Sequence, residues 1–396
     1  MRRGGADPDL YCMNVTHLFG SFRGLGGVQN LLRHHHAEDA QFGLNSRFVI
    51  YHEPEEPPVE RVRFLNVEDR TRLQTLRQRF AAAARVARTD VAVYHGLWGM
   101  GLFSDLDHAH RRVLVVHGKF EGLERLLRAR DGMLDGVVTV SEETAQLVAR
   151  TLPAMALERI IRLPLPITRC PVVLPPRSPL LGRPLRLGYC GRLIEEHKRV
   201  SRLPELVRAL RAAGVDFELE LLGDGPARTE LLAALADGTP VRWHGTLAGA
   251  DYWRALAAWD VIAFCSDTEG MPIALLEALS VGVLPVYPRI GSGGDNYVAG
   301  VWPELLYPPR DMLAAARAIQ HLQRLAEPEL NALRLRASQA VEGNRSEDYF
   351  PKLNAALRRM SEQPRRSHGR GGLLVHVLGG CSMKTLARLA AWRRRW

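Results

Sequence analysis

Cysteine is scarce in this sequence, and its positions exclude several kinds of site. The five cysteines among 396 residues are odd in number, widely spaced and without a C-x-x-C pair. This pattern argues against a zinc site, a redox dithiol and a disulfide framework. We therefore expect reduced thiols, as in the cytoplasm.

Long apolar runs are also missing. No stretch approaches the roughly 18 consecutive apolar residues that a membrane-spanning helix needs. Near the N-terminus, Asp7, Pro8 and Asp9 stand where a signal peptide requires an apolar run. We expect neither a membrane span nor export.

Acidic residues are absent after Glu362, although eight lysines and arginines follow it. Removing these eight charges from the formal net charge of +10 leaves +2 for the rest of the chain. Any polyanion partner is thus expected at the C-terminal tail. We expect no nucleic-acid partner.

The first half alternates short apolar runs with helical patterns, which predicts a parallel β-sheet covered by helices on both faces. A proline-rich segment then marks a domain boundary, and a second alternation follows it. The expected strands of the two halves are 12–18, 48–51, 91–94, 113–116 and 137–140, then 185–190, 217–222, 241–244, 261–264 and 283–287.

The predicted organisation is therefore two doubly wound α/β domains in series. The expected parts are an N-terminal domain (1–170), a proline-rich linker (171–184), a C-terminal domain (185–345), a closing helix (346–362) and a basic tail (363–396). In such sheets ligands bind beyond the carboxyl ends of the strands, so the loops after each strand are the candidate sites.

The sharpest motif runs from Ser266 to Ala278 and joins an apolar strand to a helix. Glu269 is expected in the loop and Glu277 on the helix, so that both face a ligand at the helix N-terminus. Free backbone N–H groups at that terminus suit a diphosphate. Carboxylates suit a vicinal diol, because each can accept two hydrogen bonds.

A second motif, Tyr189-Cys190-Gly191-Arg192-Leu193, ends the first strand of the second domain, and Lys198 follows six residues after Arg192. A guanidinium can grip two phosphate oxygens, and an ammonium adds a point charge. Arg192 and Lys198 are therefore candidates to neutralise a departing diphosphate.

These segments resemble the family 4 retaining glycosyltransferases of the GT-B fold, over most of residues 12–360. Glu269 and Glu277 match the E-x7-E signature, Gly191, Arg192 and Lys198 match G-R-(x)-K, and Gly223 to Pro226 match G-D-G-P. Further similar stretches are His244-Gly245-Thr246, Asp135 to Ser141, Leu305 to Asp311 and Gly26-Gly27.

The resemblance implies that a sugar passes, with retained configuration, from a nucleoside-diphosphate sugar to a hydroxyl of a saccharide or lipid-linked saccharide. The two domains would face each other across a cleft, with no metal and no cofactor. His117, Glu269, Arg192 and Lys198 would be catalytic. The implied donor-binding residues are Gly26, Gly27, Gly191, Gly223, His244, Gly245, Thr246, Ser266, Gly270, Met271, Pro272, Ile273 and Glu277.

The sequence departs from the family pattern in two places. Asp295 stands where the family has a glutamate after a glycine pair, and Glu195 and Glu196 add anions near the expected diphosphate. The sugar and the base therefore stay open. A polysaccharide or lipopolysaccharide product of bacteria is expected from family precedent only.

Other interpretations remain for several features. The chain could be a nucleotide-sugar epimerase or hydrolase of the same fold, or an inactive donor-binding partner of another enzyme. The basic tail fits an interfacial helix at an anionic membrane surface, a solubilising end or a partner site. The run His34-His35-His36 suggests a solvated helix face, because adjacent side chains on a helix cannot close around one ion.

Overall fold

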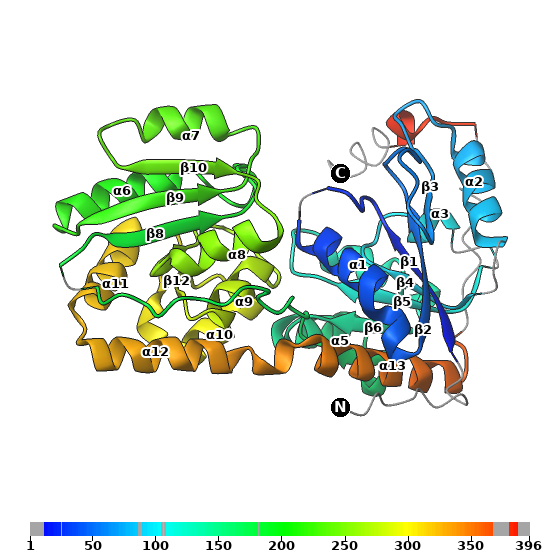
Figure 1. Ribbon diagram of the computed structural model, residues 1–396. Coiled ribbons are helices and arrows are strands. Elements are labelled where there is room, and N and C mark those ends of the chain that lie inside the picture. Colours follow the sequence, from blue (N-terminus) through cyan, green and yellow to red (C-terminus); the bar gives the residue numbers. More distant parts are fainter. Residues whose placement is uncertain are drawn as a thin grey trace. The chain divides into compact units, whose positions relative to one another are not determined.

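The computed structural model describes residues 12–24, 26–85, 89–103, 106, 108–180, 182–366 and 380–386. The chain forms two compact units (Figure 1). The first unit comprises Met1–His117, Glu121–Leu163 and Phe350–Trp396, and the second comprises Gly118–Phe120 and Pro164–Tyr349.

The first unit is built on a seven-stranded parallel sheet in the order β3-β2-β1-β4-β5-β6-β7. Its strands are β1 (Met13–Phe19), β2 (Leu44–Ile50), β3 (Val62–Phe64), β4 (Thr89–Tyr94), β5 (Ala109–Val116), β6 (Gly136–Thr139) and β7 (Ile160–Arg162). Its helices include α1 (Gly27–Glu38), α2 (Leu73–Arg85), α3 (Met100–Phe103), α4 (Leu123–Arg128), α5 (Glu142–Thr151) and most of α13 (Ser346–Glu362).

Alternating side chains of β2 show how this sheet is covered on both faces. Phe48 and Ile50 pack in one buried cluster with Leu32 of α1. Val49, between them, packs in another cluster with Leu76 and Phe80 of α2. Because successive strand residues point to opposite faces, α1 and α2 cover opposite sides of the sheet.

The second unit contains a six-stranded parallel sheet in the order β10-β9-β8-β11-β12-β13. The strands are β8 (Leu185–Cys190), β9 (Phe217–Leu222), β10 (Val241–Gly245), β11 (Val261–Ala263), β12 (Leu284–Pro288) and β13 (Leu306–Tyr307). The helices are α6 (Arg202–Ala212), α7 (Arg228–Ala234), α8 (Gly249–Ala258), α9 (Ile273–Ser280), α10 (Gly293–Val301), α11 (Met312–Arg324) and α12 (Glu327–Ala340).

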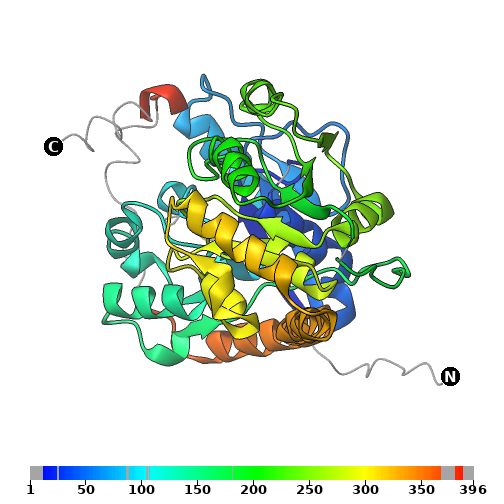
Figure 2. The same cartoon turned by 90° about the vertical axis from the view of Figure 1, so that its left-hand side faces the viewer.

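Helices cover both faces of this sheet as well. α11 packs beside α6, whereas α12 packs against α9 and α10. Right-handed crossovers place these two groups on opposite faces, because the strand order runs outward from β8 through β9 to β10 and then back to β11. Figure 2 shows this unit turned by 90° about the vertical axis, so that the left-hand side of Figure 1 faces the viewer.

Two doubly wound α/β domains are therefore confirmed, and every strand expected from an apolar run is present. Three strands, β3, β7 and β13, were not predicted from the sequence. These are three, three and two residues long and lie at the edges of their sheets. A run of that length is too short to show a periodic pattern.

Parts of the basic tail lie against the first unit. Ser382 forms an isolated bridge with Arg72, and Met383 packs on the main core cluster. Arg366 forms an ion pair with Asp131 at 2.9 Å. Residues 367–379 lie outside the described part, as do residues 387–396, which carry most of the predicted interfacial helix. Among the helices that the structure describes, none has the length and apolar character to cross a bilayer.

Trp259 and Gly188 form a very close contact in the second sheet. Trp259 is fully buried, and a Cβ atom at Gly188 in β8 would lie 2.0 Å from its indole ring. The indole N–H donates to Glu220 of β9 at 3.1 Å. The large ring therefore covers β8 only because residue 188 has no side chain.

We expect Gly188→Ala to lower the free energy of unfolding by about 1–3 kcal/mol, because the added methyl group forces Trp259 away from β8. The matched control is Gly300→Ala in α10, where a Cβ meets no atom within 4 Å. That change should stabilise the helix by up to about 1 kcal/mol. Urea unfolding followed by circular dichroism measures both; equal stabilities of the two variants would contradict the contact.

Candidate active site

Three glycines hold the loops at the carboxyl ends of β8, β9 and β10 together. Gly191 N donates to Leu222 O at 3.0 Å, and Gly223 N donates to Gly245 O at 2.7 Å. A Cβ at Gly223 would lie 1.9 Å from Gly191 O, so the two backbones approach too closely for any side chain. The structure thus brings together Gly191, Gly223 and Gly245, and gives the first two a packing role.

Beside these glycines, Lys198 forms a largely buried ion pair with Glu269. Lys198 Nζ lies 2.6 Å from Glu269 Oε1, and the two side chains are 16% and 8% exposed. Ser266 Oγ donates to the same oxygen at 2.6 Å. One polar cluster therefore contains three of the predicted residues, Lys198, Glu269 and Ser266. Lys198 and Glu269 come from loops that are 71 positions apart in the sequence.

Arg192 lies on the same loop as Lys198 but is exposed. Its guanidinium is 3.5 Å from His197 Nε2, a distance too long for a strong bond. Arg192 is thus the more solvent-accessible of the two predicted cations, whereas Lys198 is held by Glu269.

Asp267 fixes the loop that carries Lys198, and the sequence analysis did not find it. Its carboxylate accepts hydrogen bonds from Arg199 at 2.6 Å and from Arg202 at 2.7 Å. Its backbone N–H donates to His197 O at 2.9 Å. These bonds tie the loop after β8 to the loop after β11. The available signal was the position of Asp267 within the same strand-to-helix motif as Glu269.

Glu277 lies within α9 and is 7% exposed. Burial raises the pKa of its carboxyl group to about 7, against a lowering contribution from the Tyr252 hydroxyl, which donates to Oε2 at 2.5 Å. Cys190 Sγ lies 3.9 Å from that hydroxyl, and burial raises the pKa of the thiol to about 12. Cys190 is therefore not a nucleophile, and Glu277 changes charge close to neutral pH.

The remaining residues of the motif form the turn between the two glutamates. Gly270 forms an isolated bridge with Gly118, and Gly293 N donates to Gly270 O at 3.2 Å. Met271 and Ile273 are buried, and Pro272 caps α9. As expected from their spacing, Glu269 lies in the loop before the helix and Glu277 lies on it.

His244 and Asp295 are each engaged in local structure. His244 Nε2 lies 3.1 Å from Glu220 Oε2, which points the ring back along the sheet. Gly245 and the exposed Thr246 follow it at the strand end. Asp295 accepts from Gly291 N at 2.9 Å and from Ser292 N at 3.0 Å, so its carboxylate closes the first turn of α10.

In the first unit, Gly26 immediately precedes α1 and Gly27 is its first residue. His117 follows β5, and its ring stacks on that of His95 with centroids 5.4 Å apart. His117 Nε2 is 3.2 Å from His95 Nδ1. The predicted residues of the first unit thus lie after β1 and after β5.

The prediction of a solvated helix face for His34-His35-His36 is wrong, because His35 belongs to a buried cluster. His35 is buried, not solvated, and its Nδ1 lies 2.9 Å from Asp39 Oδ1. His17 Nε2 lies 3.3 Å from Asp39 Oδ2. Metal-ligand atoms of His17, His35 and Asp39 lie within 4.8 Å of one another, and no other such group of three occurs among the described residues. Each of these atoms already takes part in a hydrogen bond or close ion pair inside the cluster.

Burial also determines the charge of the histidines. It lowers the pKa of His17 to about 4 and of His117 to about 3, and it lowers that of His95 well below its usual range. Burial alone would raise the pKa of Asp39, but His35 and His17 outweigh it and hold the pKa below its usual range. At neutral pH the cluster therefore contains the carboxylate of Asp39 and the neutral imidazole rings of His17, His95 and His117.

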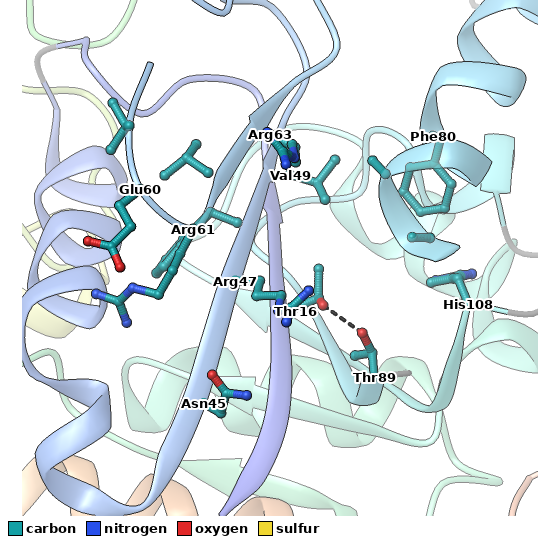
Figure 3. Close-up of a pocket in the computed structure, with 15 residues that line it drawn as sticks. Thr16, Asn45, Arg47, Val49, Glu60, Arg61, Arg63, Phe80, Thr89 and His108 are labelled. Atoms are coloured by element: carbon teal, nitrogen blue, oxygen red, sulfur yellow. Dashed lines mark hydrogen bonds between the residues drawn. The ribbon is translucent and has the colours of Figure 1, made fainter. Parts of the chain in front are cut away.

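A pocket of the first unit lies elsewhere. It has a volume of about 350 Å³, and Arg47, Arg61 and Arg63 are among its lining residues (Figure 3). Thr89 and Val62, which also line it, are the first residues of their strands. None of the predicted site residues lines this pocket.

Comparison with known proteins places part of the second unit in a family match. Residues 184–324 match the family of glycosyl transferases group 1. The putative colanic acid biosynthesis glycosyltransferase WcaL of Salmonella typhimurium is 29% identical over 169 residues, which cover 40% of this chain and 41% of that protein. The chain spans about half the length of the first curated relatives that it matches.

Two solved structures show the fold. The lipopolysaccharide outer core galactosyltransferase WaaB matches with a TM-score of 0.66 and 17% identity, covering 88% of this chain and 99% of that one. Anabaena Alr3699/HepE in complex with UDP matches with a TM-score of 0.68 and 14% identity, covering 88% and 100%. The chain therefore has the two parallel-sheet α/β domains of the GT-B fold.

The depressed histidine pKa values make the protein sensitive to mild acid. Between pH 6.5 and the folded values near 4 and 3, the unfolded chain binds protons at His17, His95 and His117 and the folded chain does not. Stability is therefore full above pH 6.5 and lost as the pH falls. Glu277 has the opposite effect, because its raised pKa means that the folded chain binds a proton there in this pH range. It is one group against three histidines.

We expect the melting temperature to fall by more than about 5 °C between pH 7 and pH 5, as differential scanning calorimetry measures. The control is His52→Gln, since His52 is exposed; this variant should show the same slope. A melting temperature that stays constant or rises over this interval would show that the buried rings are not held neutral.

Proposed function

We propose that this chain is a retaining glycosyltransferase that moves a sugar from a nucleoside-diphosphate sugar to a hydroxyl acceptor. The observation that carries the proposal is the placement of two glutamates by one strand-to-helix turn. Glu269 is paired with Lys198, and Glu277 is buried against Tyr252. Both lie in the segment that matches the glycosyl transferases group 1.

The donor is assigned to the carboxyl ends of β8, β9 and β10. Arg192 and Lys198 stabilise the departing diphosphate, Glu277 accepts hydrogen bonds from the ribose diol, and Glu269 orients the transferred sugar. A carboxyl group with a pKa of about 7 gains acceptor capacity when it ionises, so the diol of a bound donor favours proton release from Glu277.

The transfer proceeds on one face of the sugar. The acceptor oxygen bonds to the anomeric carbon as the bond from that carbon to the phosphate oxygen breaks, and the acceptor proton passes to the phosphate. Lys198 and Arg192 supply the positive charge that the leaving group needs. Lys198 is already held in place by Glu269, so little reorganisation is required of it.

The acceptor is a saccharide or a lipid-linked saccharide, in bacterial polysaccharide or lipopolysaccharide synthesis. Relatives with such names, WcaL and WaaB, support this assignment. We place the reaction in the cytoplasm, with the basic tail against the inner face of the membrane. The tail's eight cations without an acid suit an anionic lipid surface.

A panel of UDP, GDP, ADP and CDP sugars tests donor binding by thermal shift. We expect one donor, at about 100 times its Kd, to stabilise the wild type by several degrees. Glu277→Ala should abolish this shift, whereas the exposed Glu230→Ala on α7 should keep it. If no donor stabilises the wild type, the proposed function fails. Binding without transfer to any acceptor would favour an inactive partner, and release of free sugar would favour a hydrolase.

Turnover of the donor found in this way tests the role of Lys198. We expect Lys198→Ala to lower kcat by about 10²–10³-fold with a smaller change in KM, because the charge acts mainly on the developing diphosphate. The control is Lys352→Ala, at an exposed position of α13. An unchanged kcat in a Lys198→Ala variant that still shows the thermal shift would remove Lys198 from the reaction.

A further inference from the structure

Three buried side chains and the half-buried His117 form a continuous line that begins at Asp39. His17 Nε2 lies 3.3 Å from Asp39 Oδ2, His17 Nδ1 lies 2.9 Å from His95 Nε2, and His95 Nδ1 lies 3.2 Å from His117 Nε2. His17, His95 and Asp39 are each at most 2% exposed. The line joins a carboxylate deep in the first unit to the residue assigned to the reaction centre.

The parallel sheet brings these rings together. His17 is in β1, His95 directly follows β4 and His117 directly follows β5, and these strands are neighbours in the sheet order. The backbone N–H of His95 donates to Leu18 O at 3.0 Å, which aligns the ends of β1 and β4. Asp39 begins the short 3-10 helix after α1 and lies under β2, where Ser46 donates to its Oδ2.

The carboxylate of Asp39 determines which atom donates and which accepts in every hydrogen bond of this line. An ionised carboxylate only accepts, so His17 donates from Nε2 and its Nδ1 is left as an acceptor. That nitrogen takes the Nε2 proton of His95, and His95 Nδ1 in turn takes the Nε2 proton of His117. Burial keeps all three rings neutral, so each has a single proton to place.

The last nitrogen of the line, His117 Nδ1, is then an unprotonated acceptor. It is buried, and among the described residues it has no hydrogen-bond partner. A buried acceptor without a donor is costly, which singles it out as a position for a ligand group. The matching group is a hydroxyl, the donor that sugars carry in abundance.

We propose that Asp39, His17 and His95 are positioning residues that hold His117 in its Nε2–H tautomer, so that Nδ1 accepts a hydrogen bond from a hydroxyl group of a bound sugar. This rests on the proposed function for the identity of the ligand. The tautomer itself is a property of the free protein.

The first measurement is made without substrate, by long-range ¹H–¹⁵N correlation NMR of the histidine rings at pH 7. We expect His17, His95 and His117 all to carry their proton on Nε2. A proton on Nδ1 of His95 or His117, a charged ring, or a metal ion bound by His17 with His35 and Asp39 would overturn the proposal. This outcome does not depend on whether the chain is a glycosyltransferase.

Two variants separate positioning from packing. Asp39→Asn supplies an amide that can donate, so we expect His117 to populate the Nδ1–H form and kcat to fall by about tenfold, the effect of one hydrogen bond. His35→Gln removes the other histidine on Asp39 but leaves the line to His117 intact, so His117 should keep its proton on Nε2. If Asp39→Asn does not fold, the wild-type spectrum alone decides.

Addition of substrate then tests the acceptor role of Nδ1. We expect the ¹⁵Nδ1 resonance of His117 to shift when the sugar that donates the hydroxyl binds, with those of His17 and His95 unchanged. A shift with the nucleotide-sugar assigns the hydroxyl to the transferred sugar, and a shift only with the saccharide assigns it to the acceptor. No shift with either, in a protein that binds both, would overturn the acceptor role.

Discussion

Charged groups that are buried at the carboxyl ends of parallel strands must neutralise one another, and this constraint explains most of the candidate site. A buried ion without a partner is far more costly than any single contact that the fold could gain. Lys198 is accordingly matched to Glu269, and Asp267 to two arginines. Away from these strand ends, the buried Asp39 receives its bonds from imidazoles and a hydroxyl. Each carboxylate thereby fixes the loop or ring that carries its partner.

The exception to this matching is Glu277, whose partner is a neutral tyrosine. Burial raises the pKa of its carboxyl group to about 7, although the hydrogen bond from Tyr252 lowers it in part. The two glutamates of one motif therefore have different partners: an ammonium group contacts Glu269, and a phenol contacts Glu277. Their different tasks in the proposed reaction follow from that difference.

Much of the second unit could be predicted from the sequence because its signals are local. The motif from Ser266 to Ala278 contains its own strand end, loop and helix, and the glycines after β8 and β9 stand at strand ends. The partners Tyr252 and Asp267 were missed, since only the folded chain shows which strand-end groups meet. The histidine line depends on positions up to 78 residues apart. Its one sequence signal was a histidine at or near the end of three predicted strands.

The contact between Gly188 and Trp259 has a consequence for how this chain can change over generations. The ring fills the space that a side chain at residue 188 would need, and its N–H shares Glu220 with His244 at the strand end. A larger residue at 188 is therefore acceptable only once the tryptophan has been replaced by something smaller, and that replacement would leave Glu220 with one donor fewer. We therefore expect substitutions at residues 188 and 259 to occur together in related sequences.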